Sequence, residues 1–225
     1  RPTHKVQLDL TSDDPGEGLV SDPVSGLLTF TPDNWNAPQV VTVRGVDDQE
    51  ADGNTTYSIQ IGDASSEDGV YNGMSVDNVE VQNFDDETAA ILLDPSSGLQ
   101  TSEGGAGDRF TVRLNSRPAG TVELSIVADD LTEVEVSPAS HTFTQDNWDA
   151  PREVNLSGVD DAIADGNISF TIVVSVSGGS DPAYAVVPPV EASGVNVDDE
   201  TAGFLLGAEE LVTREDGLAG PQISL

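Results

Sequence analysis

The sequence contains no cysteine, so disulfide bonds cannot stabilise its fold. It also lacks any run of about 18 apolar residues, which excludes a membrane-spanning helix. Basic residues are scarce, because eight Lys and Arg face 41 Asp and Glu and leave a net charge of −33. A surface of this charge repels phosphate groups, which argues against binding to nucleic acid or to an anionic membrane. Cations and basic surfaces are the expected partners.

Aromatic residues are also few, at 5% of the chain, but the apolar residues follow a clear pattern. They alternate with polar residues in short runs, such as RFTVRLN (109–115), TVELSIV (121–127) and ISFTIVVSV (168–176). A period of two buries one face of a β-strand, and no helical periodicity competes with it. The sequence therefore predicts an all-β fold with acidic loops rather than a disordered acidic chain.

The chain carries an internal repeat. FTPDNWNAPQVVTVRGVDDQEADGN from Phe30 matches FTQDNWDAPREVNLSGVDDAIADGN from Phe143 without a gap, and the same offset relates FDDETA (84–89) to VDDETA (197–202). A third copy begins where GFLLGAEELVTREDG echoes AILLDPSSGLQTSEGG from Ala90. Repeats of this kind indicate homologous structural units. We therefore expect a first repeat that lacks its N-terminal strands (1–89), a complete repeat (90–202) and the N-terminal strands of a third (203–225).

Each complete repeat is expected to form a seven-stranded antiparallel sandwich of the immunoglobulin type. The strands are predicted near 91–101, 109–115, 121–127, 132–144, 152–158, 168–176 and 190–197, with kinks at DPSSG in the first and SPAS in the fourth. Five aromatic residues are expected to anchor the core or its rim: Phe110, Phe143, Trp148, Phe170 and Tyr184. Because successive antiparallel strands alternate in direction, the first, third, fifth and seventh strands should all finish at one end.

Acidic residues follow all four of those strands. The predicted cluster contains Glu103, Asp129, Asp130, Asp160, Asp161, Asp165, Asp198, Asp199 and Glu200. Two carboxylates about 4 Å apart repel by roughly 4 kcal/mol at an effective dielectric near 20, and no Lys or Arg lies in these loops. Ca²⁺, which takes six to eight oxygen ligands, would relieve this repulsion. The alternative is a solvated acidic surface. Zn²⁺ is disfavoured because His4 and His141 lie outside the cluster.

The repeated motif resembles a known family. LTFTPDNWNAPQVVTVRGVDDQEADGN, followed by DDETA, is similar to the Calx-β motif, and TSEGGAGDRFTVRLN is similar to its beginning. The family is named for calcium-binding domains of sodium–calcium exchangers and recurs in tandem in large bacterial extracellular and adhesin-like proteins. The resemblance covers nearly the whole chain. It implies a seven-stranded sandwich that binds Ca²⁺ at the distal loops.

The resemblance also implies which residues bind the ion. In the complete repeat the matching positions are Glu103, Asp129 or Asp130, Asp160, Asp161, Asp198 and Asp199. In the first repeat they are Asp13 or Asp14, Asp47, Asp48, Asp52, Asp85 and Asp86, and the counterpart of Glu103 is missing, so this site is expected to be impaired. The family has further glutamates where this sequence has Ala162, Ile163 and Ala164, which suggests fewer ions and weaker binding.

These observations favour a structural function. Repeats joined end to end would form a rod, and Ca²⁺ near each junction would stiffen it. The expected protein is a calcium-binding repeat of a large bacterial cell-surface or secreted protein, related to adhesion and located outside the cell. The alternative is a carbohydrate- or protein-binding accessory module of a secreted protein. Catalysis is not expected. Residues 203–225 could also add as strands to the first repeat of another copy.

Overall fold

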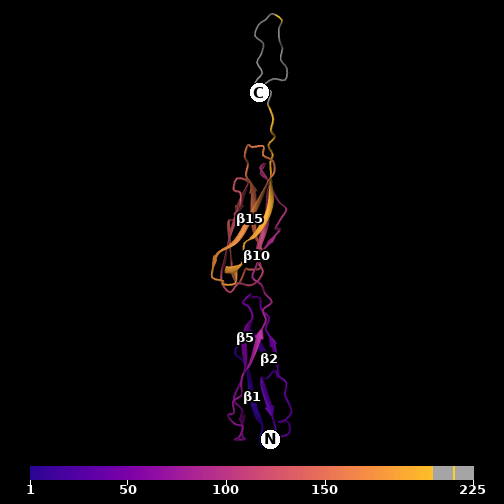
Figure 1. The fold of residues 1–225 in the computed structure, drawn as a ribbon, viewed down its shortest axis with the longest axis vertical. Helices are drawn as coiled ribbons and strands as arrows, with labels where there is room; N and C mark the ends of the chain where they lie inside the picture. Colours follow the sequence, from indigo (N-terminus) through magenta and orange to yellow (C-terminus); the bar gives the residue numbers. More distant parts are fainter. Residues whose placement is uncertain (205–214, 216–225) are drawn as a thin grey trace.

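Two elongated β-sandwich bodies lie end to end in the computed structural model, which describes residues 1–204 and Glu215 (Figure 1). The first unit contains strands β1 to β7 and the second contains β8 to β16. Every sheet draws its strands from one unit. Among the described residues, no helix is long and apolar enough to cross a membrane. The all-β fold predicted from the sequence is confirmed.

The second unit is a sandwich of two sheets, ordered β12-β14-β10-β8 and β13-β11-β15-β16-β9. Its strands are β8 (Ile91–Asp94), β9 (Leu99–Ser102), β10 (Gly107–Leu114), β11 (Val122–Ala128), β12 (Val134–Ser137), β13 (Ser140–Phe143), β14 (Arg152–Gly158), β15 (Ile168–Gly179) and β16 (Val190–Val197). A single 3₁₀ turn, η1 (Tyr184–Val186), lies between β15 and β16.

Two predicted strands are each divided between the sheets. The segment 91–101 forms β8 in one sheet and β9 in the other, and 132–144 forms β12 and β13 in the same way. Proline has no N–H to donate to a ladder, so Pro95 and Pro138 interrupt pairing where the chain changes sheets. The prediction of a purely antiparallel sandwich is wrong at one place, because β9 pairs with β16 in parallel.

The core of the second unit is built from the inward faces of both sheets. Phe110, Phe143, Phe170 and Tyr184 are fully buried, and Trp148 packs against them while partly exposed. The Tyr184 hydroxyl donates to the Ser116 carbonyl at 2.8 Å and accepts from the Ser116 N–H at 3.0 Å. The predicted aromatic core is therefore confirmed.

The first unit has a smaller core, centred on Leu10, Tyr57 and Ile59. Its sheets run β3-β1-β5-β7, with β6 beside β1, and β2-β4. The strands are β1 (Val6–Ser12), β2 (Gly18–Asp22), β3 (Leu27–Phe30), β4 (Thr42–Gly45), β5 (Thr55–Ile61), β6 (Ser65–Ser66) and β7 (Val79–Asn83). Within the described residues nothing corresponds to β8, β9 and β10, so β4 and β7 each keep one edge unpaired.

An apolar groove opens on the first unit beside β1 and β3. Its volume is about 260 Å³, and Phe30, Trp35, Tyr71 and Met74 are among the residues that line it. The predicted third repeat and its strand exchange fall on 203–225, almost all of which lies outside the described residues. The repeat boundaries themselves remain predictions.

Candidate metal centre

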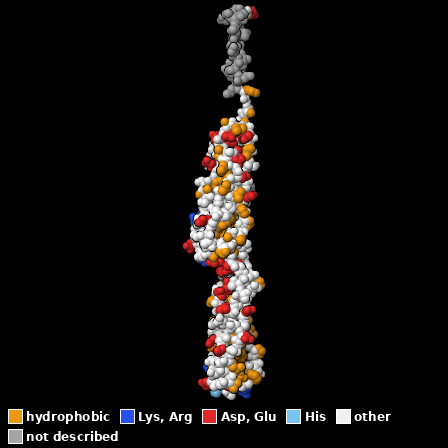
Figure 2. All heavy atoms as spheres, turned by 60° about the vertical axis from the view of Figure 1, so that its left-hand side comes forward, with side chains coloured by type: hydrophobic (Ala, Val, Ile, Leu, Met, Phe, Trp, Pro, Cys, Tyr) orange, Lys and Arg blue, Asp and Glu red, His pale blue; other side chains and the backbone are white. Residues whose placement is uncertain are grey.

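The loops that follow β9, β11, β14 and β16 meet at one end of the second unit. The N–H of Gly166, in the loop after β14, donates to Oδ2 of Asp198 at 2.6 Å. The N–H of Glu103, after β9, donates to the Val197 carbonyl at 3.1 Å. Acidic side chains gather at this end and again at the junction between the two units (Figure 2). The topology thus brings together acidic segments that are distant in sequence.

Three carboxylates come closest in the second unit. Oxygen atoms of Glu103, Asp199 and Glu200 all lie within 4.8 Å of one another. Glu103 is only 5% exposed, and its Oε2 has no hydrogen-bond partner among the described residues; Oε2 of Glu200 is buried and unpartnered too. A buried polar atom without a partner is costly, so these two carboxylates need either a proton shared between them or a bound cation.

The protonation of these carboxylates reflects the crowding. Pairing with Glu103, reinforced by burial, raises the pKa of Glu200 to about 7. Burial is also the main cause that raises the pKa of Glu103, and repulsion from Asp198, Asp161 and Asp165 adds to it. In the absence of a metal the pair therefore holds a proton near neutral pH, which a bound cation would displace.

Several predicted ligands also serve the local backbone. Asp198 accepts hydrogen bonds from the N–H groups of Gly166 and Glu200, and these lower its pKa. Asp129 accepts from the Thr171 N–H at 2.7 Å, so it ties the loop after β11 to β15. Two more of the predicted ligands accept local backbone hydrogen bonds, Asp130 from Thr132 and Asp161 from the Ile163 N–H. Asp160 and Asp165 are exposed.

The first unit repeats this loop geometry. Gly53 N–H donates to Asp85 at 2.6 Å as Gly166 does to Asp198, and both glycines adopt a positive φ, 87° and 81°, that other residues rarely take. Despite partial burial, amide hydrogen bonds from Gly53 and Glu87 lower the pKa of Asp85. The repetition shows that the sequence motif encodes a specific loop conformation.

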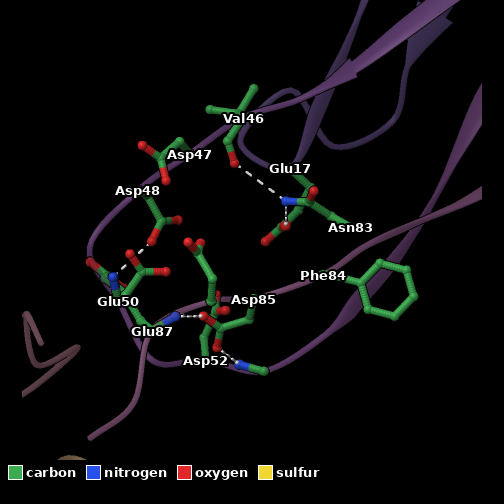
Figure 3. A pocket seen from close by; sticks show the side chains of 12 residues that line it. Glu17, Val46, Asp47, Asp48, Glu50, Asp52, Asn83, Phe84, Asp85 and Glu87 are labelled. Atoms are coloured by element: carbon green, nitrogen blue, oxygen red, sulfur yellow. Dashed lines mark hydrogen bonds between the residues drawn. The ribbon is translucent and has the colours of Figure 1, made fainter.

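The first unit also contains its own acidic group. Carboxylate oxygens of Asp47, Asp86 and Glu87 lie within 4.8 Å of one another. They border a cavity of 20 Å³, room for one water-sized occupant, and Figure 3 shows acidic side chains gathered around it while the Phe84 ring points away. Two further predicted residues line this cavity: Asp48 accepts from the Glu50 N–H, and Asp52 has a pKa raised by burial and by Glu17. Asp13 and Asp14 are not among the residues that line it; they accept from the N–H groups of Ser58 and Gly16.

Three residues near the two acidic groups are not among the ligands predicted from the sequence: Glu200, Glu87 and Arg117. Glu200 was placed at this end of the sandwich but not among the predicted ligands, and Glu87 was not considered, although DDETA carries a glutamate in both repeats. The acidic loops themselves contain no Lys or Arg, as the sequence shows, but a basic residue of the other unit reaches one of them at the junction. Arg117 of the second unit lies 3.6 Å from Glu50 of the first. Its loop lies at the opposite end of its own unit, so only the stacking of units reveals it.

The donor set suits a hard cation. Ca²⁺–oxygen bonds of 2.3–2.6 Å allow two ligand oxygens on one ion to lie up to about 5 Å apart, as these do. Each group offers three carboxylates, and the remaining ligands would come from loop carbonyls and water. The two histidines lie elsewhere: His4 is 3.8 Å from Glu67, and His141 Nε2 is 3.1 Å from the Glu153 carbonyl.

Comparisons with known proteins leave the family open. No family model matches the chain, and no curated protein matches it. Similar solved structures include the periplasmic chaperone SfaE (9% identity, 49% of this chain and 57% of the chaperone, TM-score 0.38) and the apo form of the Calx CBD1 domain (14%, 51% and 100%, 0.33). Domains 4 and 5 of the S-layer protein SbsC are also similar (13%, 84% and 70%, 0.32). At these scores the similarity assigns neither a family nor a function to the chain.

Proposed function

We propose that this chain is a calcium-binding structural module of a large bacterial cell-surface or secreted protein. In this proposal the sandwiches form part of a rod-like extender related to adhesion. Ca²⁺ binds at the end of each unit that faces the next one and stiffens the rod. The module performs no catalysis.

The observation that carries the proposal is the state of Glu103. This side chain is buried, its Oε2 has no partner among the described residues, and it lies beside Asp199 and Glu200. A cation between the three would take the place of the proton that Glu103 and Glu200 share, and it would also offset the repulsion from Asp199. A merely solvated acidic surface would instead leave its carboxylates in water.

The junction supports the mechanical part of the proposal. Residues 46–54 supply Asp47 to the acidic group of the first unit, and the same loop contacts the second unit through Gln49 and Glu50. An ion that fixes this loop would therefore fix a surface on which the neighbouring unit rests. The location outside the cell and the link to adhesion rest on the sequence resemblance.

One observation favours the alternative of a ligand-binding module. Trp35 is 45% exposed and lines the apolar groove of the first unit with Phe30, Tyr71 and Met74. Aromatic faces of this kind can hold a sugar or a peptide. Trp148, its counterpart in the second unit, packs against the core of that unit.

A thermal melt of the metal-free chain, titrated with Ca²⁺ and in parallel with Mg²⁺, tests the proposal. A ligand that binds only the folded state at a hundredfold excess over its Kd raises stability by about 2.7 kcal/mol. We expect a saturable rise selective for Ca²⁺, reduced by Asp199→Asn and Glu103→Gln. Asp149→Asn, at the opposite end of the unit, is the matched control. An equal rise with Mg²⁺, or none, would reject the calcium site, and a rise with glycans alone would favour the binding module.

A further inference from the structure

A hydrogen-bonded pair of polar side chains lies beneath each acidic end. In the second unit, Asn196 Nδ2 donates to Glu133 Oε2 at 3.2 Å, and the two residues are 1% and 6% exposed. In the first unit, Asn83 Nδ2 donates to Glu17 Oε2 at 3.1 Å, in a partly buried position. The same pair therefore occurs at the same place in both sandwiches.

Each pair binds the backbone of the valine that begins the acidic loop, both at its carbonyl and at its N–H. The asparagine amide also donates to the carbonyl of Val159 (3.4 Å) or, in the first unit, of Val46 (3.3 Å). The N–H of the same valine donates to the backbone carbonyl of the glutamate, at 2.9 Å and 3.0 Å respectively. Figure 3 shows Asn83 between the Val46 carbonyl and the Glu17 carboxylate.

The pair in the second unit connects the segments that bear the candidate ligands. Asn196 lies in β16, shortly before Asp199, and its Oδ1 accepts from Thr101 Oγ1 at 2.8 Å. Thr101 lies in β9, shortly before Glu103. Val159 directly precedes Asp160. One amide side chain thus fixes the ends of three strands whose following residues are acidic.

In each unit a glycine leaves room for the asparagine side chain. A Cβ at Gly158 would lie 2.5 Å from Asn196 Oδ1, and a Cβ at Gly45 would lie 2.5 Å from Asn83 Oδ1. Any larger residue in the motif G-V-D-D would push the asparagine aside. The asparagine accounts for the glycine that begins this motif in the first repeat, and at Gly158 the Ser102 carbonyl, which would lie closer still to such a Cβ, adds to the restriction.

Burying a glutamate and an asparagine is costly compared with an apolar pair of similar volume. Core packing therefore does not account for them. We propose that Glu133–Asn196 and Glu17–Asn83 are positioning pairs, which act through the loops and hold the carboxylates above them at ion-binding distance. This inference rests on the calcium site proposed above.

Calcium titration by calorimetry, well below the melting temperature, tests the inference in the second unit. Glu133→Gln keeps an oxygen that can accept from Asn196, whereas Glu133→Ala and Asn196→Ala break the pair. We expect Glu133→Gln to preserve the second-unit Kd within about twofold and the two alanine variants to raise it about tenfold or more, as loss of an outer-shell partner does. Glu135→Gln, an exposed glutamate in β12, is the matched control.

Three results would overturn the inference. If Glu133→Gln weakens binding as much as Glu133→Ala does, the charge of Glu133 acts on the ion and positioning is not its role. If neither alanine variant changes the Kd, the pair does not position the ligands. If the alanine variants of the second unit fail to fold, Asn83→Ala and Glu17→Gln give the same comparison in the first unit, and an unchanged Kd in Asn83→Ala then counts against the inference.

A metal-free readout separates this inference from the proposed function. A wild-type chain that binds no Ca²⁺ contradicts the calcium function alone. Hydrogen exchange at the Gly166 amide, which donates to Asp198, then reports the geometry of the loop without an ion. Faster exchange in Asn196→Ala and Glu133→Ala, but not in Glu133→Gln, supports the positioning pair, and unchanged exchange in all three rejects it.

Discussion

Arg117 and Glu50 form an ion pair between the two sandwiches, with Nη1 of Arg117 3.6 Å from Oε1 of Glu50. The backbone reinforces the contact, because the Arg117 N–H donates to the Gln49 carbonyl at 2.7 Å. Glu50 also borders the cavity of the first acidic group. A basic residue from one unit therefore neutralises part of the acidic end of the other.

Substitution of Arg117 by alanine is expected to loosen the junction without unfolding either unit. The pair is partly exposed, so its contribution to stability is about 1 kcal/mol or less. Distance distributions between spin labels placed in the two units should broaden in Arg117→Ala. Arg109→Ala removes a comparable pair with Glu153, 3.4 Å apart inside the second unit, and should leave the distribution unchanged.

The metal-free second unit is expected to lose stability as the pH rises from about 4.5 to about 7. Glu200 has a folded-state pKa of about 7, above its unfolded value, so the folded state holds the proton more tightly throughout this window. The lowered pKa values of Asp198 and Asp130 have the opposite effect and remove stability only below about pH 4. Melting curves in chelator across this range should show the decline, and Glu200→Gln should reduce it, leaving the smaller part due to the raised pKa of Glu103.

Calcium affinity should rise over the same pH window, because the ion displaces the proton that Glu103 and Glu200 hold. Calorimetry in buffers of different ionisation enthalpy measures the number of protons released. Release of about one proton from the second unit near pH 6 agrees with this arrangement. Binding without proton release would contradict a site formed by this pair.

The second unit is expected to bind Ca²⁺ more tightly than the first. Glu103 contributes a buried carboxylate, and the described residues of the first unit contain no counterpart. Calorimetry of the chain should therefore resolve two affinities, and Glu103→Gln should weaken the tighter one alone. Asp86→Asn is the complementary variant and should weaken only the other.

The Tyr184 hydroxyl is expected to matter for stability alone. Tyr184→Phe removes the partner of the buried Ser116 N–H and carbonyl and should cost about 1–3 kcal/mol of unfolding free energy in the second unit. Urea denaturation measures this cost. Tyr71→Phe, at a partly buried tyrosine of the first unit, controls for loss of a hydroxyl group, and calcium affinity should not change in either variant.

The sequence predicted most of the fold because its signals are local. Alternation and turn signals located the strands of the second unit, although β8 with β9 and β12 with β13 were each expected as one kinked strand, and the strand directions followed from antiparallel pairing. The parallel contact of β9 with β16 was not predicted, since it depends on a strand that changes sheets. Within the acidic end, residue type could not separate Glu103, which is buried and unpartnered, from Asp129, which binds a backbone amide. That distinction arises from packing.

The parallel pairing of β9 with β16 has a mechanical consequence. Tension along the two units would draw β9 toward the N-terminal end and β16 toward the C-terminal end. The two strands are joined from Leu99 with Gly194 to Ser102 with Val197, and their hydrogen bonds lie across the pull. For the strands to slide past one another, these hydrogen bonds would have to break together rather than one at a time. The second unit is thus loaded in shear. Its resistance to force is governed by the unfolding rate rather than by equilibrium stability.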